Sequence, residues 1–120
     1  MAKTDAKIMY DEEEDILTLT KRQKVKSSLD IGDFIIDVDS RDHITGLEIL
    51  NASENLNIPS EELKALRQAT MTVTYKPRHA TITLIMQFSG KEKDITIPLA
   101  VELGRGAVTT ENTLFATAHT

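Results

Sequence analysis

Carboxylates are the side chains best placed to do chemistry in this sequence, because they gather in two short stretches. Five of them, Asp11 to Asp15, stand in a row directly before an alternating apolar segment. Such a run suits a cation or a basic partner protein, but it also suits a hairpin turn whose charges stay in water. Extended or turning backbone fans consecutive side chains outward, so they cannot all converge on one ion. We therefore predict a turn.

The second acidic stretch is "DVDSRD", which contains Asp37, Asp39 and Asp42. Asp37 and Asp39 share one face of a predicted strand, and hard cations such as calcium need several oxygen ligands. A calcium loop, however, needs an acid or amide at position 41 and a glycine at position 42. The sequence has Arg41 and Asp42 there, and Asp is an ordinary turn residue. We expect a hairpin and no bound metal.

Basic residues form the two segments "KRQKVK" (21–26) and "YKPRH" (75–79). Lys76, Arg78 and His79 could contact a phosphate, and Tyr75 could stack on a base. Two hairpin tips with solvated charges explain the same residues better. The chain carries 14 basic and 19 acidic side chains, a net charge of −5. This balance argues against broad nucleic-acid binding, which needs a basic face.

The sequence contains no recognisable motif of an enzyme active site. The sequence has no GxGxxG, GxxxxGK[ST], HExxH or GxSxG motif, and it has no cysteine. His43, His79 and His119 are far apart, and each is better explained as a surface histidine than as a general base. We predict no catalytic residue, no cofactor and no enzymatic activity.

Composition is that of one ordinary globular domain. The chain has 120 residues, of which 40% are hydrophobic, 28% charged and only 4% aromatic. The N-terminal "MAKTDAKIMY" has no apolar core of a signal peptide, and no apolar run is long enough to span a bilayer. These features predict a cytoplasmic protein without a membrane contact.

Alternation of apolar and polar residues with period two, the period of a β-strand, dominates the chain. One residue too many around Gly46 predicts a β-bulge, and Pro98 predicts an edge strand, because proline cannot donate to a ladder. The alternation predicts strands near residues 7–10, 17–20, 25–31, 34–38, 44–50, 71–75, 80–88 and 95–103.

One helix is predicted over residues 61–69. Ser60 is a good N-cap, and Glu61 and Glu62 would lie in the first turn, where the helix dipole favours negative charge. The fold class is then α+β, mostly β: an antiparallel meander of about six to eight strands with one inserted helix. We expect a single domain over residues 1–103, an N-terminal meander (7–53) followed by a helix-and-strand extension (54–103), and a flexible tail (104–120).

Two blocks resemble a known family. "YDEEEDILTLT" and "DFIIDVDSRDHITGLEILNAS" are similar to the motifs of a family of small prokaryotic proteins, domain of unknown function twenty-two eighty-three. Asp33 and Asp42 stand where members of that family often have glycine. The resemblance covers residues 7–53 and implies a compact β-meander without an established activity. The helix and strands that follow look like the extension of the longer, archaeal-type members. The family-motif positions are Tyr10, Asp11, Asp15, Asp37, Asp39, Gly46 and Glu48.

Three functions remain open. The first is a protein-interaction or self-assembling domain, a homodimer formed through the long alternating strand 95–103. The second is an antitoxin-like partner that masks a small basic protein with its acids, because some short relatives look like antitoxins. The third is a nucleic-acid-binding protein that uses Lys76, Arg78 and segment 21–26.

Overall fold

The computed structural model describes residues 6–21, 23–76, 79–88, 91–99 and 109–116. Their strands form one sheet in the order β3-β4-β5-β2-β1-β9-β6-β7-β8. The elements are β1 (Lys7–Asp11), β2 (Ile16–Thr20), β3 (Ser27–Ile31), β4 (Phe34–Val38), β5 (Ile44–Ile49), α1 (Ala52–Leu56), α2 (Ser60–Leu63), β6 (Gln68–Lys76), β7 (His79–Phe88), β8 (Lys91–Leu99) and β9 (Thr109–Ala116).

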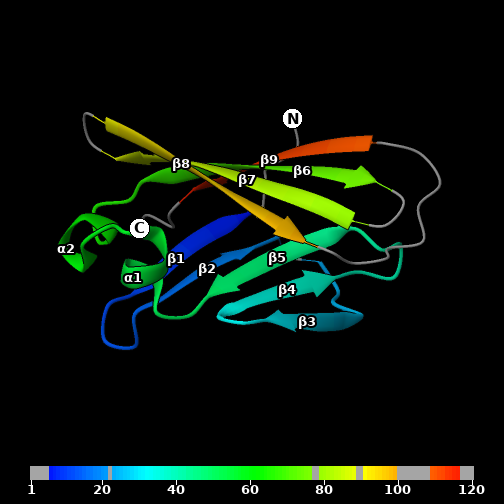
Figure 1. Ribbon diagram of the computed structural model, residues 1–120, viewed down its shortest axis with the longest axis horizontal. Coiled ribbons are helices and arrows are strands. Elements are labelled where there is room, and N and C mark those ends of the chain that lie inside the picture. The colour runs from blue at the N-terminus through cyan, green and yellow to red at the C-terminus, as the bar shows by residue number, and fades with distance from the viewer. Residues whose placement is uncertain (1–5, 22, 77–78, 89–90, 100–108, 117–120) are drawn as a thin grey trace.

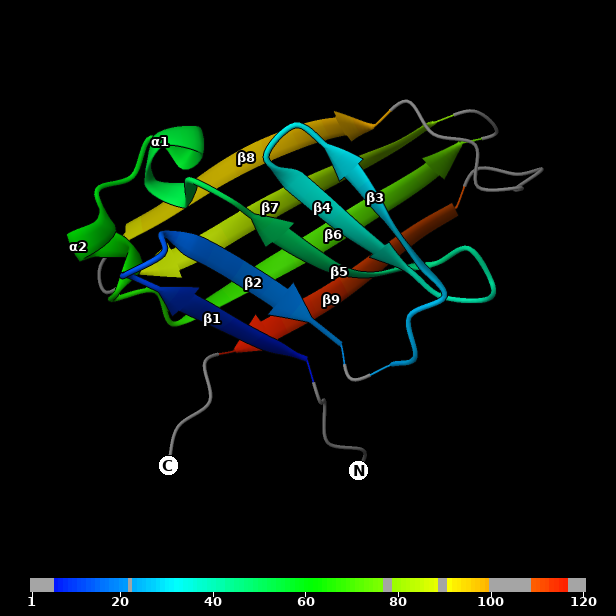
Figure 2. The same cartoon turned by 90° about the horizontal axis from the view of Figure 1, so that it is seen from below.

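The sheet curls into two facing layers, β1–β5 and β6–β9, whose strands cross each other (Figures 1 and 2). Strands within each layer pair antiparallel, whereas β1 and β9 meet in parallel at a single residue pair, Lys7 and Ala116. Both short helices lie at one end of the layers. The prediction of a mostly-β fold with a helical insert is confirmed, although the sheet has nine strands and one parallel contact.

The core lies between the layers because each strand turns its apolar alternate residues inward. In β6 and β7 the residues alternate strictly between buried and partly buried. Tyr75 is fully buried, and its hydroxyl accepts a hydrogen bond from the Ile44 N–H of the other layer at 2.8 Å. The β-branched threonines that alternate with this core suit a pleated, half-buried surface.

Three sequence-based expectations need correction. The helix predicted over residues 61–69 is replaced by α1 and α2, because residues from Gln68 onward pair with β7. Ser60 is the first residue of α2, not its N-cap, and makes no capping side-chain bond. Within the expected flexible tail, residues 109–116 form β9 and pair with β6 along its length. Residues 104–108 and 117–120 lie outside the described part of the chain.

Other expectations are confirmed. Strand β8 is the last strand of the sheet, as Pro98 predicted, although it begins at Lys91 and residues 100–103 are not described. Asp37 pairs with Gly46 and Val38 with Ile44, so Thr45 is the extra residue of a bulge. Asp42 adopts a left-handed φ of 61°, which aspartate tolerates. In the other turn Gly32, and not Asp33, has the positive φ.

The glycine at position 46 is required by crowding across the β2–β5–β4 ladder. A Cβ atom added there would lie 3.0 Å from the Asp37 carboxylate and 3.1 Å from the Leu19 carbonyl oxygen. Both contacts are closer than ordinary van der Waals distance. A side chain at position 46 would therefore force the Asp37 carboxylate or the Leu19 carbonyl to shift by a few tenths of an ångström.

We expect Gly46→Ala to lower the free energy of unfolding by about 1–3 kcal/mol, the usual cost of overpacking. Urea denaturation would measure this loss. Adding Asp37→Ser should recover part of it, because the closer contact disappears. Gly32→Asn is the control, since that position is open and asparagine tolerates its φ of 59°. Equal losses for Gly46→Ala and Gly32→Asn would contradict the crowding argument.

Candidate functional site

The connections between strands gather at two opposite ends of the molecule (Figure 2). We call the end with α1, α2, the turn 12–15 and the start of β8 the helical end. The other, the loop end, contains segments 21–26 and 39–43 together with Lys76 and His79. Successive strands run in opposite directions, so the chain returns to the loop end after β2, β4 and β6.

The acidic run is a turn at the helical end, as predicted. β1 ends at Asp11 and β2 begins at Ile16, and Glu12, Glu13 and Glu14 are exposed between them. The Asp11 carboxylate accepts a hydrogen bond from the Glu14 N–H at 3.1 Å. This arrangement spreads the carboxylates instead of focusing them on one point.

Asp15 has a separate role: it joins this turn to the start of α1. Its carboxylate accepts hydrogen bonds from the Tyr10 hydroxyl at 2.6 Å, the Ser53 hydroxyl at 2.7 Å and the Ser53 N–H at 3.1 Å. Its backbone carbonyl accepts the Ala52 N–H at 2.9 Å. A residue distant in sequence thereby satisfies free N–H groups in the first turn of a helix, which normally need a cap.

These contacts perturb both ionisable groups. Burial alone would raise the pKa of Asp15, but the hydrogen bonds from Tyr10 and Ser53 outweigh it and lower the pKa. Burial, and then the hydrogen bond to Asp15, raise the pKa of Tyr10 to about 12, although a hydrogen bond with Ser60 opposes the rise. The carboxylate is therefore stabilised as an anion and the phenol as a neutral donor.

The remaining family-motif acids also serve the fold. Asp37 accepts the Ser28 hydroxyl at 2.7 Å, across the β3–β4 pair. Asp39 accepts the N–H groups of Arg41 and His43 at 2.8 and 3.0 Å, which closes the β4–β5 turn. Glu48 lies in register with Thr18 and Ile35, in the middle of its layer. Among the described residues, no three His, Asp or Glu side chains gather as a metal site.

The predicted phosphate contacts are placed only in part. Lys76 and His79 face each other at the tip of the β6–β7 hairpin and are exposed, whereas Arg78 lies outside the described residues. Tyr75 does not belong to an exposed stacking surface, because it is fully buried. The two basic segments do share the loop end, which sequence reasoning did not anticipate.

A polar network at the loop end was also missed. The Tyr75 hydroxyl donates to Glu111 at 2.6 Å, and the other Glu111 oxygen lies 3.0 Å from His43 Nδ1. Glu111 belongs to β9, in the segment expected to be a flexible tail. The one available signal was the alternation in "TENTLFA", where Phe115 is buried.

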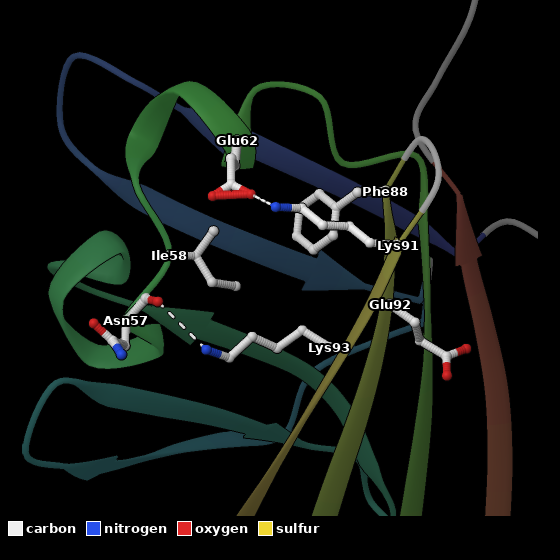
Figure 3. Close-up of a pocket in the computed structure, with 7 residues that line it drawn as sticks. All are labelled: Asn57, Ile58, Glu62, Phe88, Lys91, Glu92 and Lys93. Atoms are coloured by element: carbon white, nitrogen blue, oxygen red, sulfur yellow. Dashed lines mark hydrogen bonds and ion pairs between the residues drawn. The ribbon is translucent and has the colours of Figure 1, made fainter.

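Two of the hollows among the described residues lie at opposite ends of the molecule and could hold a small molecule. The first, of about 150 Å³, lies at the helical end between Ile58 and Phe88 (Figure 3). Lys91 pairs with Glu62 there, and Lys93 donates to the Asn57 carbonyl, so its cations are already engaged. The second, of about 380 Å³, lies at the loop end and falls within the usual size of ligand pockets.

The fold and these contacts define a small two-layered β-protein in which the described motif residues act as structural ties. Residues 7–53 match the model of a family described as Protein of unknown function (DUF2283). This match agrees with the resemblance of the same residues to that family. The matched segment begins with β1 and ends at Ser53, so it is the first layer, closed by the Asp15–Ser53 hydrogen bonds.

Two relatives have been found. An uncharacterized protein of Methanocaldococcus jannaschii is 43% identical over 58 residues, which are 48% of this chain and 50% of that protein. A Methanosarcina mazei protein, named provisionally as a hypoxanthine phosphoribosyltransferase, is 28% identical over 85 residues, 70% of this chain and 69% of that protein. No solved structure matches significantly. No helix within the described ranges is long and apolar enough to cross a membrane.

The first prediction from these contacts concerns Asp15. Because its folded pKa is depressed, it contributes stability above its unfolded pKa of about 3.9 that is lost as pH falls through the folded value. Asp15→Asn should lower the free energy of unfolding by about 1–2 kcal/mol at neutral pH and flatten this acid loss. Urea denaturation between pH 7 and 3 would measure both effects. Glu13→Gln, an exposed neighbour, should leave the pH profile unchanged.

A second prediction concerns Tyr75. Tyr75→Phe leaves the buried Ile44 N–H without an acceptor, so we expect a loss of about 1–3 kcal/mol in the free energy of unfolding. Glu111→Gln keeps an acceptor for the Tyr75 hydroxyl and should cost less. Chemical denaturation of both variants checks this order. The reverse order would show that the Glu111 charge, and not the Ile44 N–H, sets the cost.

Proposed function

We propose that this protein is a non-enzymatic interaction domain that assembles as a homodimer through the outer face of β6–β9. The single observation that carries the proposal is that, among the described residues, threonines and no charged side chains occupy the centre of this face. Its central strands present Thr70, Thr72 and Thr74 on β6 and Thr81 and Thr83 on β7, where Thr72 pairs with Thr83 and Thr74 with Thr81. The flanking strands add Thr110, Asn112 and Leu114 on β9 and Thr96 on β8.

A charge-free centre suits self-association in a chain of net charge −5. The described residues on this face carry charge only at its borders, Glu92 and Asp94 on β8 and Lys76 beside His79 at the loop end. Protein interfaces are depleted of charge at their centre, and hydroxyl groups both donate and accept, so two copies of one threonine row are complementary.

The area is sufficient for a dimer. Four strands about 4.8 Å apart, each about nine residues long with a rise of about 3.4 Å, cover roughly 600 Å². Two such faces bury about 1,200 Å² in total, above the roughly 1,000 Å² expected of a specific interface. Leu114, which is 48% exposed, and Ile85 lie on either side of Thr70 in one row and add apolar surface to the face.

Charge complementarity favours one orientation. A two-fold axis perpendicular to the strands places the loop end of one copy over the helical end of the other. Lys76 and His79 then approach the border that carries Glu92 and Asp94 of the partner subunit. This arrangement differs from the expected pairing through strand 95–103, because Ile95 on that strand packs against the core and is not free for a partner.

The antitoxin-like alternative depends on the exposed acids of the turn 12–14. Part of this charge is already neutralised, because Glu12 lies 3.4 Å from Lys64. Glu13 and Glu14 remain for a basic partner. The uncharged face supports the homodimer more directly, and we place the masking of a basic protein second.

We expect the wild-type chain to sediment as a dimer at micromolar concentration and Thr72→Lys to dissociate it, raising the dissociation constant at least about tenfold. A charge at the centre of a two-fold interface faces its own copy in a desolvated setting. Thr18→Lys is the matched control, because Thr18 is a threonine on the outer face of the other layer. Analytical ultracentrifugation measures all three. A wild-type monomer, or a Thr72→Lys dimer of unchanged affinity, would refute the proposal.

A further inference from the structure

The loop-end hollow is lined by a lysine, an arginine and a histidine against one acidic residue. Its lining residues, which come from the β2–β3 and β4–β5 connections, are Gln23, Lys24, Asp39, Ser40, Arg41 and His43. A second hollow of about 340 Å³ lies against it and shares Lys24 and Ser40, with Val25 and Lys26 added. Both belong to connections of the β1–β5 layer, away from the threonine-rich face.

The lysines around this hollow are not engaged in ion pairs with described residues, in contrast to Lys64 and Lys91 at the helical end. Lys24, Lys26 and Arg41 form no ion pair with any described carboxylate. At the helical end, Lys64 lies within 4 Å of Glu12 and Glu61, and Lys91 pairs with Glu62. Unpaired cations that converge on one hollow of an acidic protein attract an anion locally, because charges farther away than about 10 Å are screened.

Hydrogen bonds within residues 39–43 hold one side of the hollow in place. Asp39, its one acidic residue, accepts the N–H groups of Arg41 and His43. A further backbone bond, from the Asp39 N–H to the His43 carbonyl at 2.9 Å, closes the loop. Asp39 therefore holds the segment that carries Ser40 and Arg41 in one conformation. The donors left for a ligand are side chains, since these backbone N–H groups are used.

His43 is oriented by its contact with Glu111. Nδ1 lies 3.0 Å from the Glu111 carboxylate, which the Tyr75 hydroxyl fixes from the other side at 2.6 Å. Nε2 is then the ring nitrogen left to contact a ligand in the hollow. A lysine, an arginine and a serine hydroxyl form a donor set that phosphate oxygens accept, and His43 Nε2 adds a donor when both ring nitrogens carry a proton.

We propose that the loop-end hollow binds a small phosphate-bearing ligand through Lys24, Ser40, Arg41 and His43. Its chemistry fits a phosphate better than a nucleic-acid strand for two reasons. Apart from the His43 imidazole, no aromatic ring lines either hollow, so bases have no stacking platform. Asp39 and a net charge of −5 also oppose a long polyanion, whereas one phosphate group needs only the free cations.

The test is a titration of the ¹⁵N-labelled full chain, in a buffer without phosphate, with inorganic pyrophosphate and then with a nucleoside diphosphate. We expect amide shifts at Gln23 to Lys26 and within 39–43, and few at the helical end. Arg41→Gln and Lys24→Gln should each weaken binding about tenfold or more, whereas Lys64→Gln should not change it. The amide spectra also verify that each variant is folded.

The outcomes separate the possibilities. If the nucleoside diphosphate binds more tightly than pyrophosphate, the site includes the neighbouring hollow of Val25 and Lys26. If both bind equally, only the phosphate groups are recognised. No shift at millimolar ligand, or binding unaffected by both substitutions, would overturn the proposal. So would tighter binding of a single-stranded oligonucleotide that strengthens with its length. Because the hollow and the threonine-rich face are separate, Thr72→Lys should bind pyrophosphate like the wild type, whatever its oligomeric state.

Discussion

Two β-layers must stay face to face although one residue pair, Lys7 and Ala116, is their only described ladder contact. The apolar core supplies most of the attraction, but it does not fix how one layer sits on the other. The Tyr75 hydroxyl does this at the loop end, since it contacts the Ile44 N–H of one layer and Glu111 of the other. A hydrogen bond with its donor and acceptor both buried is costly to break, so it selects one arrangement.

The helical end is fixed by a different set of contacts. Asp15 connects the first hairpin to α1, and the lysines at the start of β8 contact Glu62 and the Asn57 carbonyl (Figure 3). Lysines on an edge strand also discourage pairing with another sheet, which is a common protection of such edges.

The family motif is explained by these ties more than by any reaction. Tyr10, Asp15 and Ser53 form one hydrogen-bonded group, and the Asp37 carboxylate would crowd a side chain at position 46. The spacing between motif residues therefore indicates which strands and turns contact each other in the fold. This is why the sequence predicted the turn at 12–15, the bulge at Gly46 and the edge position of β8. It could not predict α1, because Asp15 caps that helix from 38 residues away.

The number of strands that precede a connection decides at which end of the molecule its charged residues lie. The sequence did not predict this number correctly for the whole chain. In an antiparallel meander every second connection lies at the same end, so the order of the strands sorts the charges. The basic segment 21–26 and Arg41 follow β2 and β4 and therefore lie at the loop end, whereas the acids 12–14 follow β1 and lie at the helical end. A helix predicted across Gln68 and a tail predicted across Glu111 removed part of β6 and all of β9 from the count. With β9 restored, its Glu111 lies beside the hollow formed by segments 23–24 and 39–43, where it contacts His43.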